Sequence, residues 1–195
     1  MKRLLTIITL SLLFIIPTIR SQAQSHQLFD GGMMVHTGYM HATIDTLGYE
    51  AKGMNFGMGG ILRFHIGKHF RIGGEGYVST LRQMKNGSYI RTGCGGIVAD
   101  AYWCIGRWQP YLGVTIGGGS TTTLLMFDGS ANDWQAEVKT VFHKSPFFFV
   151  SPYIGVEFAI TEAMHLTLKV DRQFPIKKPE MPSGVRFCLG FVFAH

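Results

Sequence analysis

The sequence is poor in charged residues, proline and cysteine, and each shortage excludes a class of protein. Charged residues make up only 15% of the 195 residues, against about 25% in soluble domains. Apolar residues make up 46%, which is too many for an intrinsically disordered chain. The 25 Gly follow no G-X-Y repeat and there are only 7 Pro, so a collagen-like chain is excluded. The 3 Cys form no Cys-x-x-Cys pair, so no common zinc site is predicted.

Long hydrophobic runs are also missing after residue 23. A basic start, Met1-Lys2-Arg3, precedes the apolar run Leu4–Ile16, and Ser21-Gln22-Ala23 provides small residues for cleavage. This pattern predicts a secretory signal peptide over residues 1–23 and one domain over residues 24–195. The peptide holds three basic residues and no acidic one, so half of the net charge of +6 lies in it. We therefore predict no nucleic-acid partner and no transmembrane helix in the exported chain.

What the chain has instead is alternation of apolar and polar residues in units of about ten, the pattern of a transmembrane β-barrel. The predicted fold is all-β, an eight-stranded antiparallel up-and-down transmembrane barrel. The strands are expected at residues 32–42, 53–66, 70–82, 90–105, 110–124, 147–160, 165–174 and 185–194.

The predicted links between strands alternate in length. Short links are expected at residues 67–69, 106–109 and 161–164, and longer ones around 43–52, 83–89, 125–146 and 175–184. Outer-membrane barrels place short turns on the periplasmic side and longer loops outside. An even strand number also lets the sheet close, which leaves no unpaired backbone edge in lipid.

The alternation also predicts which side chains face lipid and which face the lumen. Leu112, Val114 and Ile116 oppose Tyr111 and Thr115, and the later strands continue the pattern. Aromatic residues near the predicted strand ends are expected to form interface girdles. These residues are Phe64, Phe70, Trp103, Trp108, Tyr89, Phe147 and Phe148. In a soluble β-sandwich, the alternative fold, they would be ordinary core residues.

Three segments resemble the outer-membrane-protein β-barrel domains of Gram-negative bacteria, of small OmpA/OmpX-type size. They are Pro110-Tyr111-Leu112-Gly113-Val114, Pro152-Tyr153-Ile154-Gly155-Val156-Glu157-Phe158 and the closing strand from Gly184 to Phe193. The resemblance spans about residues 30–195. It implies residence in the cell outer membrane, contact with outer-membrane lipid, and insertion by the barrel-assembly machinery through the closing strand.

Charged residues gather at lumen positions, where we expect a structural network of ion pairs. They are Arg63, Arg71, Glu75, Asp100, Glu157, Lys169, Asp171 and Arg186. If Ile160 pairs with Leu166, Glu157 lies opposite Lys169 and Asp171 lies opposite Gly155, close to Arg186. If Ile66 pairs with Phe70, Arg63 lies opposite Gly73 and diagonal to Glu75. Opposite charges so placed stabilise a sheet, and eight strands enclose an interior that side chains can fill.

No catalytic, metal-binding or cofactor-binding set is predicted. His36 and Ser79 lie on different strands with no signature linking them, and the eight His are scattered. Cys94 and Cys104 are expected on one strand, about 33 Å apart at strand rise, so they cannot bond each other. Together with Cys188 they are interpreted as small buried apolar residues.

The third long link, residues 125–146, is the predicted contact with an extracellular partner, through Phe127, Asp128, Trp134 and Phe142. It could instead be a solvated loop or a strand extension above the membrane. The predicted function is a structural or surface-interaction barrel, monomeric or loosely associated, and not an enzyme or a wide pore. Two alternatives stay open: a lipid-modifying outer-membrane enzyme, and an exported soluble barrel that binds a small hydrophobic ligand.

Overall fold

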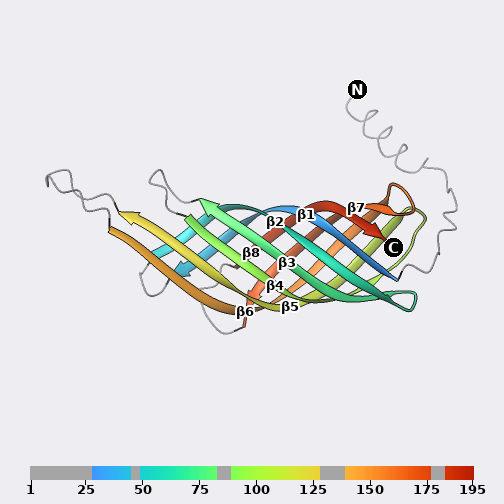
Figure 1. The fold of residues 1–195 in the computed structure, drawn as a ribbon, viewed down its shortest axis with the longest axis horizontal. Coiled ribbons are helices and arrows are strands. Elements are labelled where there is room, and N and C mark those ends of the chain that lie inside the picture. Colours follow the sequence, from blue (N-terminus) through green and yellow to red (C-terminus); the bar gives the residue numbers. More distant parts are fainter. Residues whose placement is uncertain (1–27, 45–48, 83–88, 128–138, 177–182) are drawn as a thin grey trace, which may run out of the picture.

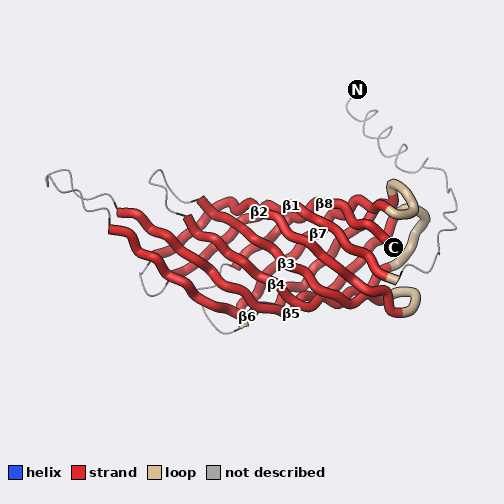
Figure 2. The backbone as a smooth tube through the Cα atoms, in the orientation of Figure 1, coloured by secondary structure: helices blue, strands red, loops and turns tan. Residues whose placement is uncertain are grey.

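The computed structural model describes residues 28–44, 49–82, 89–127, 139–176 and 183–195, and these form one closed antiparallel barrel. Each strand pairs with its sequence neighbours, and β1 also pairs with β8, so the sheet has no free edge along the barrel wall. Figure 2 shows the strongly tilted strands around a single long axis. The strands are β1 (Phe29–Ile44), β2 (Tyr49–Ile66), β3 (Phe70–Arg82), β4 (Tyr89–Tyr102), β5 (Trp108–Phe127), β6 (Lys139–Ala159), β7 (Met164–Pro175) and β8 (Ser183–Ala194).

This arrangement confirms the predicted eight-stranded up-and-down barrel. Among the described residues, no helix is long and apolar enough to cross a bilayer. The predicted signal peptide, residues 1–23, lies outside the described residues.

Three short links and both ends of the described barrel gather at one end, which we call the turn end (Figure 1). Gly67 and Gly106 have φ of +66° and +63°, a left-handed conformation that glycine adopts without steric cost. The N–H of Leu28 donates to the carbonyl of His195 at 2.9 Å, which ties the start of β1 to the end of β8. The opposite end, where the longer links were predicted, is called the loop end.

Of the strand boundaries that differ from the prediction, three affect the interior or the loop end. β1 begins at Phe29 and so includes Asp30, which was expected to lie before the strand. β4 ends at Tyr102, because Ile105 and Trp108 pair with each other and close a tight turn before β5. β6 begins at Lys139 and is therefore eight residues longer at its start than predicted.

The extra length of β6 makes a two-stranded extension with β5 at the loop end. Their ladder continues to the pair Phe127 and Lys139. Within the described residues, the pairing of β5 with β4 ends at Leu124, and the β6–β7 hydrogen bonds end with that from Ile176 to Phe148. Figure 1 shows β5 and β6 projecting past the other strands. Among the described residues, no strand pairs with the β7-facing edge of residues 139–147.

The polarity of the barrel is inverted relative to a water-soluble protein. Ile97 and Ile154 are 66% and 65% exposed on the outer wall, whereas Arg63 and Lys169 in the interior are each 1% exposed. The predicted faces of the last four strands are confirmed, as is the outward position of Phe70 and the other aromatic residues at the turn end. Phe147 is a correction: it points inward and packs with Phe149, because odd-numbered residues of β6 face the interior.

Glycines at interior positions let large side chains cross the narrow barrel. A Cβ on Gly155 would collide with the phenol of Tyr111, which lies on the neighbouring strand directly opposite it. A Cβ on Gly57 would come within 2.6 Å of the His36 ring. Residues larger than glycine at these positions would therefore push the Tyr111 and His36 rings out of place.

Candidate functional site

The candidate site is the polar interior, and its turn-end half is a cluster of five charged residues. Alternation along the strands points all five inward, and none is more than 4% exposed. The members of this turn-side cluster are Asp30, Arg63, Arg71, Asp100 and Glu157. Because two guanidinium groups face three carboxylates, each cation can bind several anions at once.

Arg63 donates to all three carboxylates of the turn-side cluster. Its Nε lies 2.7 Å from Asp30 Oδ1, its Nη1 3.2 Å from Asp100 Oδ2, and its Nη2 2.7 Å from Glu157 Oε1. The guanidinium therefore holds β2 to β1, β4 and β6. A buried charge without a partner would be strongly destabilising, so Arg63 stabilises the arrangement of all three acids.

Arg71 completes the turn-side cluster from the next strand. Its Nε donates to Asp100 Oδ1 at 2.6 Å and its Nη1 to Glu157 Oε2 at 3.0 Å. Its guanidinium also lies over the Tyr102 ring, 4.6 Å from the ring centre. His65 contacts the outer oxygen of Asp30, with Nε2 2.9 Å from Oδ2.

A second cluster occupies the middle of the interior. Lys169 donates to Glu75 Oε2 at 2.6 Å, and Arg186 makes a two-pronged pair with Asp171 at 2.8 and 2.9 Å. Lys169 also lies 3.6 Å from Asp171, which joins the two pairs. We call Glu75, Lys169, Asp171 and Arg186 the central cluster.

Tyrosines bind the central cluster from several strands. The hydroxyl of Tyr77 donates to Glu75 at 2.8 Å, and the Thr115 hydroxyl donates to the same carboxylate at 2.6 Å. Lys169 lies over the Tyr153 ring, 4.7 Å from its centre. The Tyr153 hydroxyl in turn donates to Asp100 of the turn-side cluster at 3.2 Å, so the two clusters are connected.

The predicted pair of Glu157 with Lys169 is wrong. Ala159 pairs with His165, and the Ile160 N–H donates to Met164, so the β6–β7 turn is tighter than the sequence prediction assumed. The register therefore moves by two residues, which keeps every side chain on its predicted face but changes its partner. Glu157 lies opposite Thr167.

The other predicted registers have mixed outcomes. Asp171 lies opposite Tyr153 rather than Gly155, but its predicted contact with Arg186 is present. The predicted register of β2 with β3 is confirmed, with Arg63 opposite Gly73. Arg63 nevertheless bonds Asp30, Asp100 and Glu157, and the expected diagonal contact with Glu75 does not form.

Asp30 is the member of the network that the sequence analysis missed. It lies an even number of residues before His36, so it shares the inward face of β1. Alternation therefore indicated an inward position for Asp30, but the strand was predicted to begin at residue 32, two residues after Asp30. Gly31 and Gly32 follow Asp30 and hide the alternation there.

The loop-end half of the interior contains both apolar and uncharged polar side chains. The buried ones include Met40, Leu81, Ile90, Phe147 and Phe149, together with hydroxyl residues such as Thr92, Thr121 and Thr123. Both side-chain atoms of Asn55, which is 0% exposed, lack a hydrogen-bond partner, as does His36 Nδ1. Polar groups here are therefore less completely satisfied than in the turn-side cluster, where Arg71 Nη2 is the exception.

His36 and Ser79, which no sequence signature linked, meet in the interior. His36 Nε2 lies 2.6 Å from Ser79 Oγ, because β1, β2 and β3 are adjacent and the intervening residue, Gly57, has no side chain. The pair has the distance of a nucleophile and its base. Both residues are buried, and His36 Nδ1 has no hydrogen-bond partner that would orient the ring.

Two of the three cysteines lie at least partly in the interior. Cys188 is buried and Cys94 partly buried, but Cys104 is exposed in the link after β4, so it is neither buried nor on the strand of Cys94 as expected. Among the described residues, no group of three or more His, Cys, Asp or Glu side chains is placed to hold a metal ion.

The predicted partner residues lie at or beyond the β5–β6 extension. Phe127 and Phe142 are strand residues, at the end of β5 and near the start of β6. Asp128 and Trp134 fall outside the described residues. The structure thus supports the strand-extension interpretation for residues 125–127 and 139–146 of the predicted link.

No family model and no curated protein sequence matches this chain. Solved structures do match. Neisserial surface protein A (NspA) is 14% identical with a TM-score of 0.63, covering 86% of this chain and 97% of its own. The outer membrane protein OprG from Pseudomonas aeruginosa is 10% identical with a TM-score of 0.53, covering 86% and 95%.

A third solved structure is Ail, the attachment invasion locus protein of Yersinia pestis, which is 10% identical with a TM-score of 0.52, covering 85% of this chain and 98% of its own. At these identities the likeness concerns the fold. The chain therefore has the fold of the small eight-stranded outer-membrane barrels, as its sequence segments predicted.

Proposed function

We propose that this chain is a bacterial outer-membrane barrel whose charged interior holds the wall closed and whose β5–β6 extension contacts partners outside the cell. Its location is supported by the inverted polarity. Ile97, Leu112 and Ile154 lie on an outer wall where water would be unfavourable, while the ion pairs are inside. In hydrocarbon such a closed sheet satisfies all of its backbone groups.

The surface role rests on one observation, the strand edge of β6 beyond the barrel. Because Ile176 N–H donates to Phe148, alternation turns the backbone groups of Phe142 and Lys144 to the same side of β6. No described strand pairs with them there. A strand edge that no described strand covers can bind extended polypeptide by adding a strand, so the partner class is an extended segment of an extracellular protein.

Location can be tested by extracting outer membranes and comparing unboiled with boiled protein on a gel. We expect the protein in the outer-membrane fraction, with compact migration before boiling and slower migration after it, because the barrel resists detergent until heated. Protein that stays in solution without detergent would contradict the proposal and favour the soluble-barrel alternative.

The surface role needs a variant that keeps the barrel. Replacing residues 125–141 by Asn-Gly joins Leu124 to Phe142, which are already directly opposite each other, through a two-residue hairpin turn. The variant shortens the β6 edge by residues 139–141 but keeps Phe142 and Lys144, so cells displaying it should bind to immobilised extracellular proteins more weakly than cells displaying the wild type. Lys144→Pro, which removes one edge N–H, should weaken binding, and Lys144→Ala should not. Equal binding by all four strains would refute the surface role.

An acyl-transfer enzyme is a second candidate because Ser79 and His36 are within hydrogen-bond distance. The mass spectrum of lipid A from cells with and without the chain decides between the two functions. A deacylated or acylated species that disappears in Ser79→Ala would replace the present proposal, and unchanged spectra would leave the non-enzymatic function standing.

A further inference from the structure

The charges on the outer face of the barrel wall are all of one sign. Among the strand residues whose side chains the structure describes, every acidic one is buried in the interior; these are Asp30, Glu75, Asp100, Glu157 and Asp171. The charged residues exposed on the outer face of these strands are Lys52, Arg91, Lys144 and Arg172. The described wall therefore presents cations, and no carboxylate, to its surroundings.

Two of these cations lie in one row near the loop end. Arg91 on β4 is directly opposite Thr122 on β5, and Thr122 is directly opposite Lys144 on β6. Because neighbouring strands are about 4.8 Å apart, the Cα atoms of Arg91 and Lys144 are separated by about 10 Å. Thr122 is short and half-buried, so the two long side chains can reach one anion from both sides. We call these three residues the basic row.

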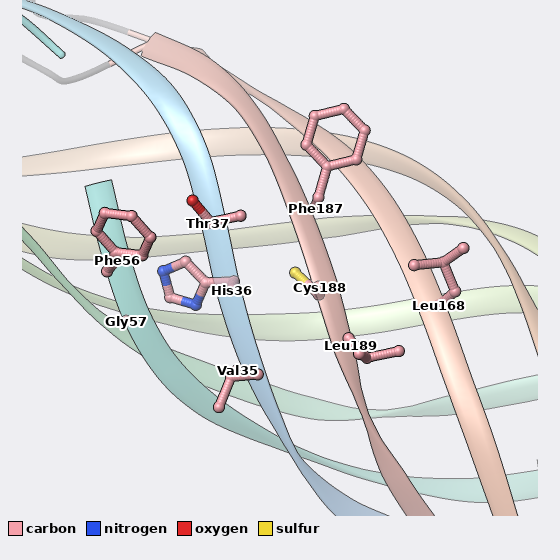
Figure 3. A pocket seen from close by; sticks show the side chains of 9 residues that line it. All are labelled: Val35, His36, Thr37, Phe56, Gly57, Leu168, Phe187, Cys188 and Leu189. Carbon is pink, nitrogen blue, oxygen red and sulfur yellow. The ribbon is translucent and has the colours of Figure 1, made fainter. Parts of the chain in front are cut away.

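A row of the same geometry lies closer to the turn end and has no charge. Thr37 on β1 is directly opposite Phe56 on β2 and Phe187 on β8, and Figure 3 shows the two rings on either side of it. These residues line a groove in the outer wall whose lining includes no Lys, Arg, Asp or Glu. The two rows differ in charge although both place a threonine between two longer side chains.

The two rows lie at different heights above the turn end. Thr37 comes eight residues after Phe29, and Thr122 comes fourteen residues after Trp108. Phe29 and Trp108 are exposed aromatic residues at the turn end. At the rise and tilt of barrel strands, the two lengths correspond to about 20 Å and 35 Å along the barrel axis, and the apolar band of such barrels is about 25 Å tall. The uncharged row therefore lies within the hydrocarbon layer, and the basic row lies beyond it, at the level of lipid headgroups.

A lipid phosphate has the charge that complements the basic row. A guanidinium binds phosphate through two parallel hydrogen bonds, and an ammonium binds it as a compact point charge. Basic side chains next to a membrane surface attract anionic lipids. Phe148 lies four residues after Lys144 on the same face of β6 and is 68% exposed. An acyl chain that runs from the phosphate into the hydrocarbon layer therefore has an apolar side chain to contact.

We propose that Arg91 and Lys144 form a site on the outer wall for the phosphate group of an outer-leaflet lipid, whose acyl chains pass Phe148. The inference rests on the membrane location proposed above, because only a barrel in a membrane has lipid headgroups at this height. It is independent of the β6 strand edge, which uses the backbone of Lys144 rather than its side chain.

The test is native mass spectrometry of the full chain in detergent, with two probes: lipid A that carries two phosphates, and the same lipid after dephosphorylation. The wild type should bind the phosphorylated probe at least about tenfold more tightly. Arg91→Gln and Lys144→Gln should each weaken this binding about fivefold, and the double variant should bind both probes alike. Arg172→Gln is the matched control, because it removes an exposed outward cation of β7 that lies outside the basic row.

Heat-modifiable migration of every variant shows that the barrel is folded before its lipid is measured. Equal binding of the two probes by the wild type would overturn the site. A loss in Arg172→Gln as large as those in the row would also overturn it, because attraction by net charge alone would then explain the binding.

Two further outcomes would identify a different occupant and so overturn the lipid site. Displacement of bound lipid A by millimolar inorganic phosphate would indicate a site for a free anion. A second copy of the chain that is retained by the wild type and lost in the double variant would indicate a protein interface. A wild type that stays in solution without detergent or lipid would instead refute the membrane location itself.

Discussion

The two halves of the barrel interior are filled by different kinds of side chain. At the turn end, five charged side chains form ion pairs with one another, and Arg63 alone binds three carboxylates from three strands. At the loop end, apolar side chains such as Leu81 and Phe149 share the space with uncharged polar ones, among them Asn55, which is buried with no hydrogen-bond partner. The comparison is therefore between a half filled by paired charges and a half filled by uncharged side chains.

The difference has a consequence for stability. Removing one member of a satisfied buried network leaves the others as uncompensated charges. Removing a polar group that has no partner relieves a desolvation cost instead. Equal-sized substitutions in the two halves should therefore have effects of different size, and even of different sign.

The largest effect is expected for Arg63→Leu. This change leaves Asp30, Asp100 and Glu157 with a single neighbouring guanidinium, so the free energy of unfolding should fall by about 3–5 kcal/mol. Urea unfolding of the barrel in lipid vesicles measures it. Arg172→Leu is the control, because Arg172 is an exposed, outward-facing arginine of β7 and should cost less than about 1 kcal/mol. Similar losses for the two variants would show that the turn-side cluster does not stabilise the barrel.

A smaller change in the free energy of unfolding distinguishes the Glu75–Lys169 pair of the structure from the Glu157–Lys169 pair that the sequence predicted. In a double-mutant cycle, Glu75→Gln and Lys169→Met should be coupled by about 1–3 kcal/mol, because the two side chains are 2.6 Å apart. Glu157→Gln with Lys169→Met should be additive within about 0.5 kcal/mol. A large coupling in the second cycle and none in the first would contradict the register of β6 with β7.

The smallest effect is expected for Asn55→Leu in the loop-end half. Since neither amide atom has a partner, the unfolding free energy should change by less than about 1 kcal/mol, with a gain in stability allowed. Thr115→Val, a similarly conservative change beside the central cluster, should cost about 1.5–3 kcal/mol because its hydroxyl bonds a carboxylate. A larger loss of unfolding free energy in Asn55→Leu than in Thr115→Val would contradict the expected difference between the two halves.

Much of the fold could be predicted from local pattern. The tight links around Gly67 and Gly106 marked strand ends, and alternation assigned Lys169 and Arg186 to the interior without any knowledge of their partners. The errors arose where the pattern was interrupted or too weak. Glycines after Asp30 hid the start of β1, and the start of β6 was missed because its first residues extend past the rest of the barrel.

The amino-acid sequence by itself determined the number of strands, their order and the face of each side chain, because a period of two residues is a local property of the extended chain. Only the tertiary structure decided which charges meet, which brings Glu75 to Lys169 and Arg63 to Glu157 across 94 positions of sequence. It also brought His36 to Ser79 and hollowed the wall at Thr37. These contacts depend on the register of every strand pair and on the tilt at which the sheet closes, and closure is a property of all eight strands together.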